Sequence, residues 1–347
     1  MGDRMKIKLI VRDSESEKIF DISNLASDIQ YETDLAGQPG KLTFILQEDP
    51  KELADDSRLQ ISNGSRVFLT IDDYGVFAGN VFTIGISETG EREITAYDHM
   101  RYLKYEHSTV APEATVSQLF EKLCTDFQLK HRVDAPSELL LEPEYYSKKT
   151  LYDILDSAIE KANMSQNSDW YFIKDDFGTL VFTSLSKCKT DLILGEKSLL
   201  TEYQYEISID NDTYNQILVT QEDEDKGSLD KWIEFDSSTQ KKWGVLQKVV
   251  TADENYNEAQ LRDMASQYLN FHNRESRTMK LTAIGVAKEG VTTGRIEKVE
   301  LASHLSAGSG FRLELSRLGI MRDAWINSIT HTFERDMHTM EMSVSIQ

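Results

Sequence analysis

The sequence predicts an α+β protein that is mainly β, in which two β regions flank a smaller α/β module. Three observations support this class. Short runs of alternating apolar and polar residues fill the first hundred positions and return after residue 201. Two amphipathic helical patterns lie between these regions. The last stretch, residues 324–347, reads as a two-stranded β unit that is similar to residues 79–98.

The first β region covers about residues 6–97. Its strands are expected where apolar and polar side chains alternate, namely at Lys6–Arg12, Lys41–Gln47, Arg66–Ile71, Val76–Phe82, Ile84–Ser87 and Arg92–Tyr97. Gly37–Gly40 is a turn that contains glycine and proline, and Asp72–Gly75 joins two alternating runs as a hairpin turn. Many short strands joined by turns favour a barrel or a sandwich.

Two amphipathic helices follow. In Thr115–Phe127, apolar side chains recur on one helical face, and Thr115 is a candidate N-cap. Thr150–Ala162 carries a second apolar stripe, and Thr150 stands three residues before Asp153, which is the spacing of a capping box. Both patterns predict helices that bury one face.

A hairpin at Trp170–Phe182, with an Asp-Asp-Phe-Gly turn, completes the α/β module. From about Thr201 the chain is expected to be β again, with strands at Tyr205–Asp210 and Tyr214–Thr220. One amphipathic helix, Asn257–Asn273, interrupts this region before strands continue to the C-terminus.

A weak internal repeat relates Gly79–Ser87 to Ala324–Thr332. The matched positions are Val81 with Ile326, Thr83 with Ser328, and Ile84 with Ile329. Each segment is followed by a polar turn, which is Glu334–Asp336 in the second copy, and by a final strand. Strand pairs also converge on such patterns, so duplication and convergence are both open explanations.

The bulk numbers restrict the class of protein. A chain of 347 residues is long enough for two or three domains. Its 38 basic and 59 acidic residues give a formal charge of −21, which opposes nucleic-acid binding. Cys124 and Cys188 are too few for a disulfide framework, and both are expected to be buried thiols. No secretion signal or membrane-spanning run is found, so no membrane insertion is expected.

No metal site is predicted. His331 and His338 flank one hairpin turn without the spacing of a zinc site, and they are interpreted as surface or cross-strand residues. Asp210–Asp212 is similar to the start of a calcium loop, but Tyr214 stands where an oxygen ligand is needed. Glu222–Asp225 is interpreted as a solvated loop.

No catalytic or cofactor-binding residue and no cofactor is predicted either. Ala307–Gly310 lacks the spacing of a nucleotide-binding loop, and no GxSxG motif is present. Carboxylate pairs are frequent, but nothing singles out a glycosidase pair. Four tryptophans are interpreted as core or interface anchors rather than a sugar-binding platform: Trp170, Trp232, Trp243 and Trp325. The chain is therefore interpreted as a non-enzyme.

Several segments together resemble a family of phage-type tail proteins. They are Ala96–Lys104, Asp175–Leu180, Ile209–Gln216, Lys242–Gln247, Ile329–Glu334 and His338–Met340. In this order and extent they resemble the XkdQ/YqbQ group, the central baseplate hub of PBSX-like prophages, contractile phages and tailocins. None of the segments is a catalytic signature, so the resemblance rests on their combination. The acidic loop Glu222–Asp225 departs from the family pattern.

The resemblance implies a homotrimeric hub that adapts a hexameric tail tube to a trimeric spike. Each subunit would supply two tube-like β-barrel domains, at residues 1–100 and 201–347, around an α/β middle module at 101–200. Part of 201–225 would pack with the first barrel. Such a hub would also contact baseplate wedge and LysM-type baseplate proteins, and it would bind no nucleic acid directly.

The same resemblance implies assembly in the bacterial cytoplasm and release by lysis within a phage-tail or tailocin particle.

A peptidoglycan hydrolase of the same tail machinery is the alternative function, and a carbohydrate-binding module that uses exposed tryptophans is a third. A hydrolase would lyse cell walls in a zymogram, whereas a hub would form rings.

Overall fold

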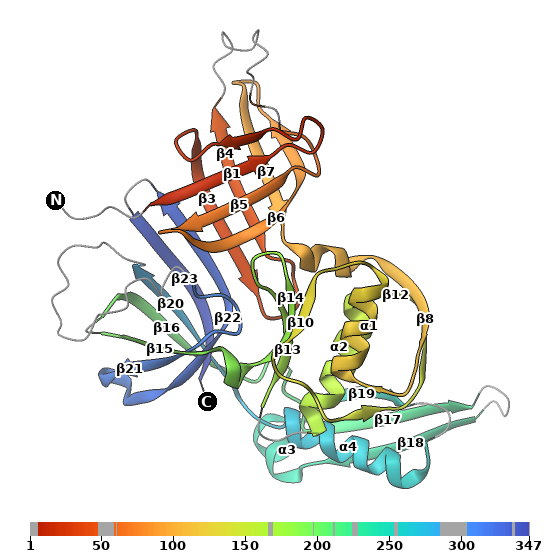
Figure 1. Ribbon diagram of the computed structural model, residues 1–347. Helices are drawn as coiled ribbons and strands as arrows, with labels where there is room; N and C mark the ends of the chain where they lie inside the picture. The colour runs from red at the N-terminus through yellow and green to blue at the C-terminus, as the bar shows by residue number, and fades with distance from the viewer. Residues whose placement is uncertain are drawn as a thin grey trace. The chain divides into compact units, whose positions relative to one another are not determined.

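The computed structural model describes residues 6–47, 59, 61–165, 169–196, 198–210, 212–223, 228–252, 256–284, 304–334 and 337–346. The chain divides into two compact units (Figure 1). The larger unit comprises Met1–Ala162, Asp169–Gln204 and Met279–Gln347, and the smaller unit comprises Asn163–Ser168 and Tyr205–Thr278. The fold is mainly β with a few helices, so the predicted class is confirmed.

Thirteen strands form one sheet, which is the main feature of the larger unit. Its N-terminal strands are β1 (Ile7–Arg12), β2 (Ile19–Asp21), β3 (Ala26–Asp34), β4 (Lys41–Gln47), β5 (Arg66–Ile71), β6 (Tyr74–Ile86) and β7 (Glu91–Tyr97). Its later strands are β15 (Lys189–Gly195), β16 (Leu200–Ser208), β20 (Ser276–Ile284), β21 (Gly310–Leu315), β22 (Ile320–Glu334) and β23 (Met337–Ile346). A 3₁₀ turn, η4 (Ser316–Leu318), joins β21 to β22.

The strand order is β16-β20-β23-β22-β3-β4-β7-β6-β5-β1-β2. The first part of β22 also pairs with β21, and β21 pairs in turn with β15. Segments from both ends of the chain therefore lie side by side, because C-terminal β22 pairs with β3 (Figure 1). Among the described strands this path has two ends, β16 and β2, rather than closing on itself. The two tube-like barrels thus stay a prediction.

Alternation along the strands builds the core of the sheet. In β4, Leu42, Phe44 and Leu46 are buried, whereas the residues between them are half-buried on the other face. Ile94 and Ala96 of β7 lie opposite Phe44 and Leu42, so one face of the sheet is continuously apolar. This cross-strand packing is the main source of sheet stability.

The predicted strands Val76–Phe82 and Ile84–Ser87 are one strand, β6, so this division was wrong. The pairing of β6 with β7 shifts register between Val81 and Thr83. Such a β-bulge adds one residue and breaks the period-2 pattern without ending the strand. The interruption in the sequence pattern therefore marks a bulge rather than a loop.

The middle of the chain forms a separate core in the larger unit. Helices α1 (Val116–Asp126) and α2 (Leu151–Ser165) share this core with a three-stranded sheet, β10-β14-β13. The strands and 3₁₀ turns here are η1 (His99–Lys104), β8 (Glu106–Ala111), β9 (Ala114–Thr115), β10 (His131–Val133), β11 (Leu140–Leu141), β12 (Glu144–Thr150), β13 (Tyr171–Asp175), β14 (Leu180–Ser184) and η2 (Leu185–Cys188).

Both predicted helix starts are confirmed. Thr115 and Gln118 form a reciprocal capping box before α1. The Thr150 hydroxyl accepts from the amide of Asp153 at 3.0 Å, and the Asp153 carboxylate accepts from the Thr150 amide at 3.4 Å. Each cap satisfies amides that the first helical turn leaves without partners.

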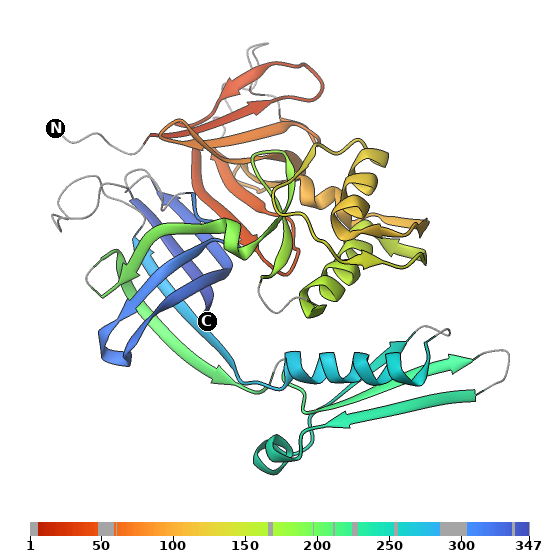
Figure 2. The same ribbon diagram turned by 60° about the horizontal axis from the view of Figure 1, so that its bottom comes forward.

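The smaller unit is a three-stranded sheet with a helix on one face, as Figure 2 shows. Its strands are β17 (Gln216–Asp223), β18 (Ser228–Phe235) and β19 (Gln247–Ala252). Helix α4 (Glu258–His272) confirms the predicted helix at 257–273, and Leu261, Ala265 and Leu269 pack on Ile217 and Val219 of β17. The short helix α3 (Ser237–Trp243) was not predicted, because it buries no residue and so has no apolar stripe.

Candidate functional site

The two β regions share a turn with the same sequence pattern and the same hydrogen bonds. Ser62–Ser65 precedes β5, and Ser306–Ser309 precedes β21. In each turn the last serine amide donates to the first serine carbonyl at 3.0 Å, and the first serine amide donates to the last serine hydroxyl at 3.1 Å. Gly64 and Gly308, with φ of +87° and +84°, adopt the left-handed conformation that favours glycine.

Each turn also binds a long strand at the same place. The Gly64 amide donates to the Val81 carbonyl at 2.7 Å, and the Val81 amide donates to the Ser65 carbonyl at 2.8 Å. In the second region, Gly308 donates to the Ile326 carbonyl at 2.8 Å, and the Ile326 amide donates to the Ser309 carbonyl at 3.0 Å.

A β-bulge follows this contact in both regions. The register of β6 with β7 shifts after Val81, and that of β22 with β23 shifts after Ile326. These two residues are the ones that align in the weak sequence repeat. An alternating pattern alone does not produce the same bulge, the same turn and the same backbone bonds, so the structure favours duplication over convergence.

The neighbours of these strands match as well. We call β3-β4-β7-β6-β5-β1 module 1 and β16-β20-β23-β22-β21-β15 module 2, in the order in which the strands lie side by side. One pairing differs, because β1 is antiparallel to β5 whereas β15 is parallel to β21. The segment from β17 to α4, which forms most of the smaller unit, is inserted between β16 and β20, where module 1 has only the short turn 35–40.

The modules join through a strand junction, in which β3 runs antiparallel to β22 over six residue pairs from Ser328–Asp34 to Phe333–Ile29. The Leu35 amide extends the ladder by donating to the Asn327 carbonyl at 2.7 Å. This junction is the candidate functional feature, because it shows how a strand at the edge of one module pairs with a strand of another module.

A polar groove of about 330 Å³ crosses the strand junction. Its floor is a cross-strand row of Thr330, Glu32, Lys41 and Tyr97. Lys41 and Glu32 form an ion pair at 3.6 Å, and both side chains are more than one-third exposed. Such a solvated pair contributes little stability, so the backbone ladder rather than the charges holds the junction.

His331 and His338 lie beneath this junction and are fully buried, so the predicted surface position was wrong and the cross-strand one is confirmed. The Nε2 atom of His331 is 2.9 Å from the Leu305 carbonyl, which only accepts, so Nε2 carries the proton. The Nδ1 atom of His331 then accepts from Nε2 of His338 at 2.8 Å. Burial, and secondarily His338, lowers the pKa of His331 to about 3.

A second buried polar cluster ties module 1 to the middle of the chain. Asp98 accepts from the Gly40 amide at 2.8 Å and from the Met100 amide at 2.9 Å. Burial, reinforced by the charge of Asp175, raises the pKa of Asp98 well above its usual value. The adjacent cavity of about 20 Å³ has room for about one water molecule, so the cluster is structural.

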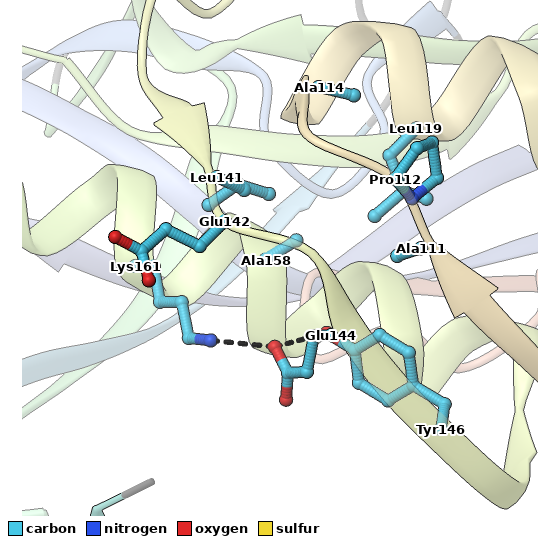
Figure 3. A pocket seen from close by; sticks show the side chains of 10 residues that line it. All are labelled: Ala111, Pro112, Ala114, Leu119, Leu141, Glu142, Glu144, Tyr146, Ala158 and Lys161. Atoms are coloured by element: carbon cyan, nitrogen blue, oxygen red, sulfur yellow. Dashed lines mark hydrogen bonds and ion pairs between the residues drawn. The ribbon is translucent and has the colours of Figure 1, made fainter. Parts of the chain in front are cut away.

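A small cavity of about 10 Å³ lies in the middle core (Figure 3). Its wall is apolar, with Ala111, Leu119 and Ala158 among the lining residues. At its rim, Lys161 Nζ lies 2.8 Å from Glu144 Oε2 (Figure 3). This space is too small for an organic ligand.

Replacing Lys161 with methionine is expected to lower the free energy of unfolding by less than about 1 kcal/mol, because the Glu144 pair is half-exposed. Urea unfolding followed by circular dichroism measures this change, with Lys122→Met, which breaks the exposed Asp126 pair, as the matched control. A loss several times larger than the control would mean that the rim pair supports the core.

Among the described residues, no group of three or more His, Cys, Asp or Glu side chains could hold a metal ion. Of the two predicted acidic segments, Asn211 and residues 224 and 225 lie outside the described part. Glu222 and Asp223 belong to strand β17 and pair with β18, so their assignment to a loop was wrong. No helix in the described segments is long and apolar enough to cross a membrane. Cys124 is buried, which raises its pKa to about 12, but Cys188 is half-exposed, so its predicted burial was wrong.

Sequence reasoning missed the repeated turn. Ala307–Gly310 was tested only as a nucleotide-binding loop, whereas it belongs to the second Ser-x-Gly-Ser turn. The signal that could have found it is the same four-residue pattern at Ser62–Ser65, before the strand that precedes the aligned hairpin.

Comparison with known proteins agrees with this architecture. The YqbQ-like family model matches residues 29–345, which include both copies of the turn, both bulges and the strand junction. The chain belongs to the YqbQ-like family. It is 27% identical to the YqbQ protein of Bacillus subtilis (strain 168) over 292 residues, and 83% of each chain is covered.

A second relative belongs to a phage-like element, and a solved tail protein shares the fold. The chain is 25% identical over 293 residues to XkdQ of the phage-like element PBSX of Bacillus subtilis (strain 168), with 84% of each chain covered. It shares the fold of a tail protein from Neisseria meningitidis MC58, with a TM-score of 0.68, 15% identity, and coverage of 98% of this chain and 96% of that one.

Proposed function

We propose that this YqbQ-like protein is a structural hub of a phage-tail baseplate, and that it works as a homotrimer between a hexameric tail tube and a trimeric spike. The observation that carries this proposal is the repeated module. Two equivalent modules per chain give six in a trimer, so one ring can offer sixfold-like positions on one face and threefold positions on the other.

The proposed division of the chain follows the sequence: residues 1–100 hold the first tube-like domain, 101–200 the middle module and 201–347 the second tube-like domain. The longer segment of the smaller unit, Tyr205–Thr278, is then an insertion into the second domain. The tail tube, the spike, wedge proteins and LysM-type baseplate proteins are the proposed partners. The proposed place of work is the tail particle, after assembly in the cytoplasm.

A structural rather than catalytic role fits the side chains. The buried polar clusters at His331 and Asp98 are tied into the backbone, and the cavities beside the Asp98 cluster and in the middle core are about 20 and 10 Å³. These two spaces are too small for a sugar chain, whereas the open groove of about 330 Å³ at the strand junction is not.

Light scattering on the purified protein is expected to give three times the 39.7 kDa chain mass at high concentration. If the isolated chain is monomeric, its copy number in purified tail particles, measured by quantitative mass spectrometry against the tube protein, decides the question. A number other than three copies per particle end would contradict the proposal. Clear lysis of peptidoglycan by this chain alone in a zymogram would favour the hydrolase instead.

A further inference from the structure

The large sheet has several strand edges without a strand neighbour among the described residues, including those of β2 and β15, and two further edges match each other. One is the outer edge of β16, at the end of the strand path. The other is the second half of β6, where β7 lies on one side and the pairing with β5 on the other side has ended at Asn80 of β6. Unpaired edges of this kind are templates for pairing with another chain.

The two edges are the counterparts of the strand junction inside the chain. In module 2, the half of β22 that follows the bulge pairs with β3 of module 1. In the part of the chain that the structure describes, the equivalent half of β6, Thr83–Ile86, has no such partner, and Thr83, Gly85 and Ile86 are exposed. The equivalent of β3 in module 2 is β16, whose outer edge is open. The open half of β6 therefore corresponds to β22, and the open edge of β16 corresponds to β3, so the two edges match the two strands of the internal junction.

The backbone of β6 is oriented for such pairing. The Ser87 amide donates to the Glu91 carbonyl at 2.9 Å, so Ser87 bonds toward β7. Because direction alternates along a strand, the amides and carbonyls of Ile84 and Ile86 point to the open side. Their counterparts, Ile329 and His331, lie opposite Thr33 and Tyr31 of β3 in the junction.

We propose that Thr83–Ile86 of β6 pairs with the outer edge of β16 in a second copy of this chain, and so repeats the β22–β3 junction between subunits. This inference rests on the proposed hub function. The contact is head-to-tail, because the two edges belong to different modules, so identical contacts generate a ring that three copies can close.

Side chains at the bulge distinguish the proposed contact from the internal one. In module 2, Asn327 accepts a hydrogen bond from Ser345 at 2.9 Å. At the same positions of module 1 stand Phe82 and Tyr97, with ring centroids 5.6 Å apart. Arg101 lies 5.4 Å above the Phe82 ring. Tyr102 completes this aromatic cluster beside the open edge.

The composition of the aromatic cluster fits an interface between subunits. Tyrosine, phenylalanine and arginine are enriched at protein–protein interfaces. Tyrosine and arginine are also frequent among the few residues that carry most of the binding energy. The internal junction is held together by the chain itself, so a polar Asn–Ser pair is sufficient there. A contact between separate copies has no such tether, and the aromatic cluster supplies apolar surface where the edge is open. Ile86, which is 73% exposed, extends that surface.

Site-specific photocrosslinking in the assembled particle tests the pairing directly. A benzoylphenylalanine at position 86 is expected to give a product of two chains, with the attachment mapped by mass spectrometry to Leu200–Ser208. The same probe at Tyr145, which is exposed on β12 of the middle module, is the control and is expected to give no attachment in that strand. Attachment of the position-86 probe only elsewhere would overturn the proposal.

Two single proline variants test whether the outward-pointing amides of β6 are needed for the contact between subunits. Ile86→Pro removes an outward amide of β6 and is expected to reduce oligomer formation at least tenfold. Ile19→Pro is the matched control, because Ile19 is 68% exposed on edge strand β2 and its amide also points away from the sheet. Circular dichroism spectra and melting temperatures of both variants are compared with those of the wild type to check that both variants fold.

Phe82→Asn places in module 1 the residue that module 2 has, and it is expected to weaken the oligomer without lowering the melting temperature to the same degree. A wild-type oligomer that persists in Ile86→Pro would overturn the edge pairing and leave the hub proposal standing. The absence of a trimer in wild-type particles would instead remove the hub proposal and this inference together.

Discussion

Replacing Gly308 with alanine is expected to destabilise the protein by about 2 to 5 kcal/mol, whereas the same change at Gly64 is expected to cost about 1 to 2 kcal/mol. Both glycines have the same left-handed backbone in the same turn, so the cost of the backbone strain is shared. A Cβ on Gly308 would lie 2.2 Å from the ring of Phe172, which is buried. A Cβ on Gly64 would meet only Ser14, at 3.7 Å.

Urea unfolding of the wild type and the two variants measures both costs, and the difference between the variants isolates the overlap with Phe172. The double variant Gly308→Ala with Phe172→Leu provides a control, because the shorter side chain is expected to recover part of the loss. Equal losses for Gly64→Ala and Gly308→Ala would mean that Phe172 moves at no cost. The two turns would then be equivalent in their packing as well as in their backbone.

Local features could be predicted from the sequence because local physical rules determine them. The capping boxes at Thr115 and Thr150 follow from residue spacing alone, and α4 follows from its apolar stripe. Lys41–Gln47 matches β4 to the residue, because a turn with glycine and proline fixes its start and alternation fixes its faces. The repeat was also visible, but only as three matched positions in an alternating pattern.

The long-range arrangement could not be read in this way. The β3–β22 junction joins residues about 300 positions apart, and no local pattern names the partner of an edge strand. The buried histidine pair was misplaced for a similar reason, because the Leu305 carbonyl that satisfies His331 lies outside the hairpin. Bulges at Phe82 and Asn327 appear in the sequence only as breaks in alternation, which also occur at loops.

The buried histidine pair is expected to make the strand junction sensitive to acid. The folded protein holds the pKa of His331 near 3, whereas its ordinary value is 6.5. As pH falls from about 6.5, the unfolded chain binds a proton at this residue and the folded chain does not, so the free energy of unfolding decreases. The largest slope from this one group is about 1.4 kcal/mol per pH unit.

Comparison with His331→Gln isolates this slope, because a glutamine amide can donate to the Leu305 carbonyl but does not titrate. Urea unfolding of both proteins at pH 8.0, 7.0, 6.0 and 5.5 is expected to show the wild type as the more stable protein at pH 8.0, with its advantage shrinking below about pH 6.5. Asp98, whose raised pKa acts in the opposite direction, is common to both proteins and cancels.

A constant difference across this range would mean that the folded protein admits a proton at the histidine pair. The neighbouring groups make that outcome informative. His338 donates to His331, and the ring of Tyr31 from β3 stacks on His331 with a centroid distance of 5.9 Å. A second proton would place two cations between β22 and β23, directly under the β3–β22 ladder.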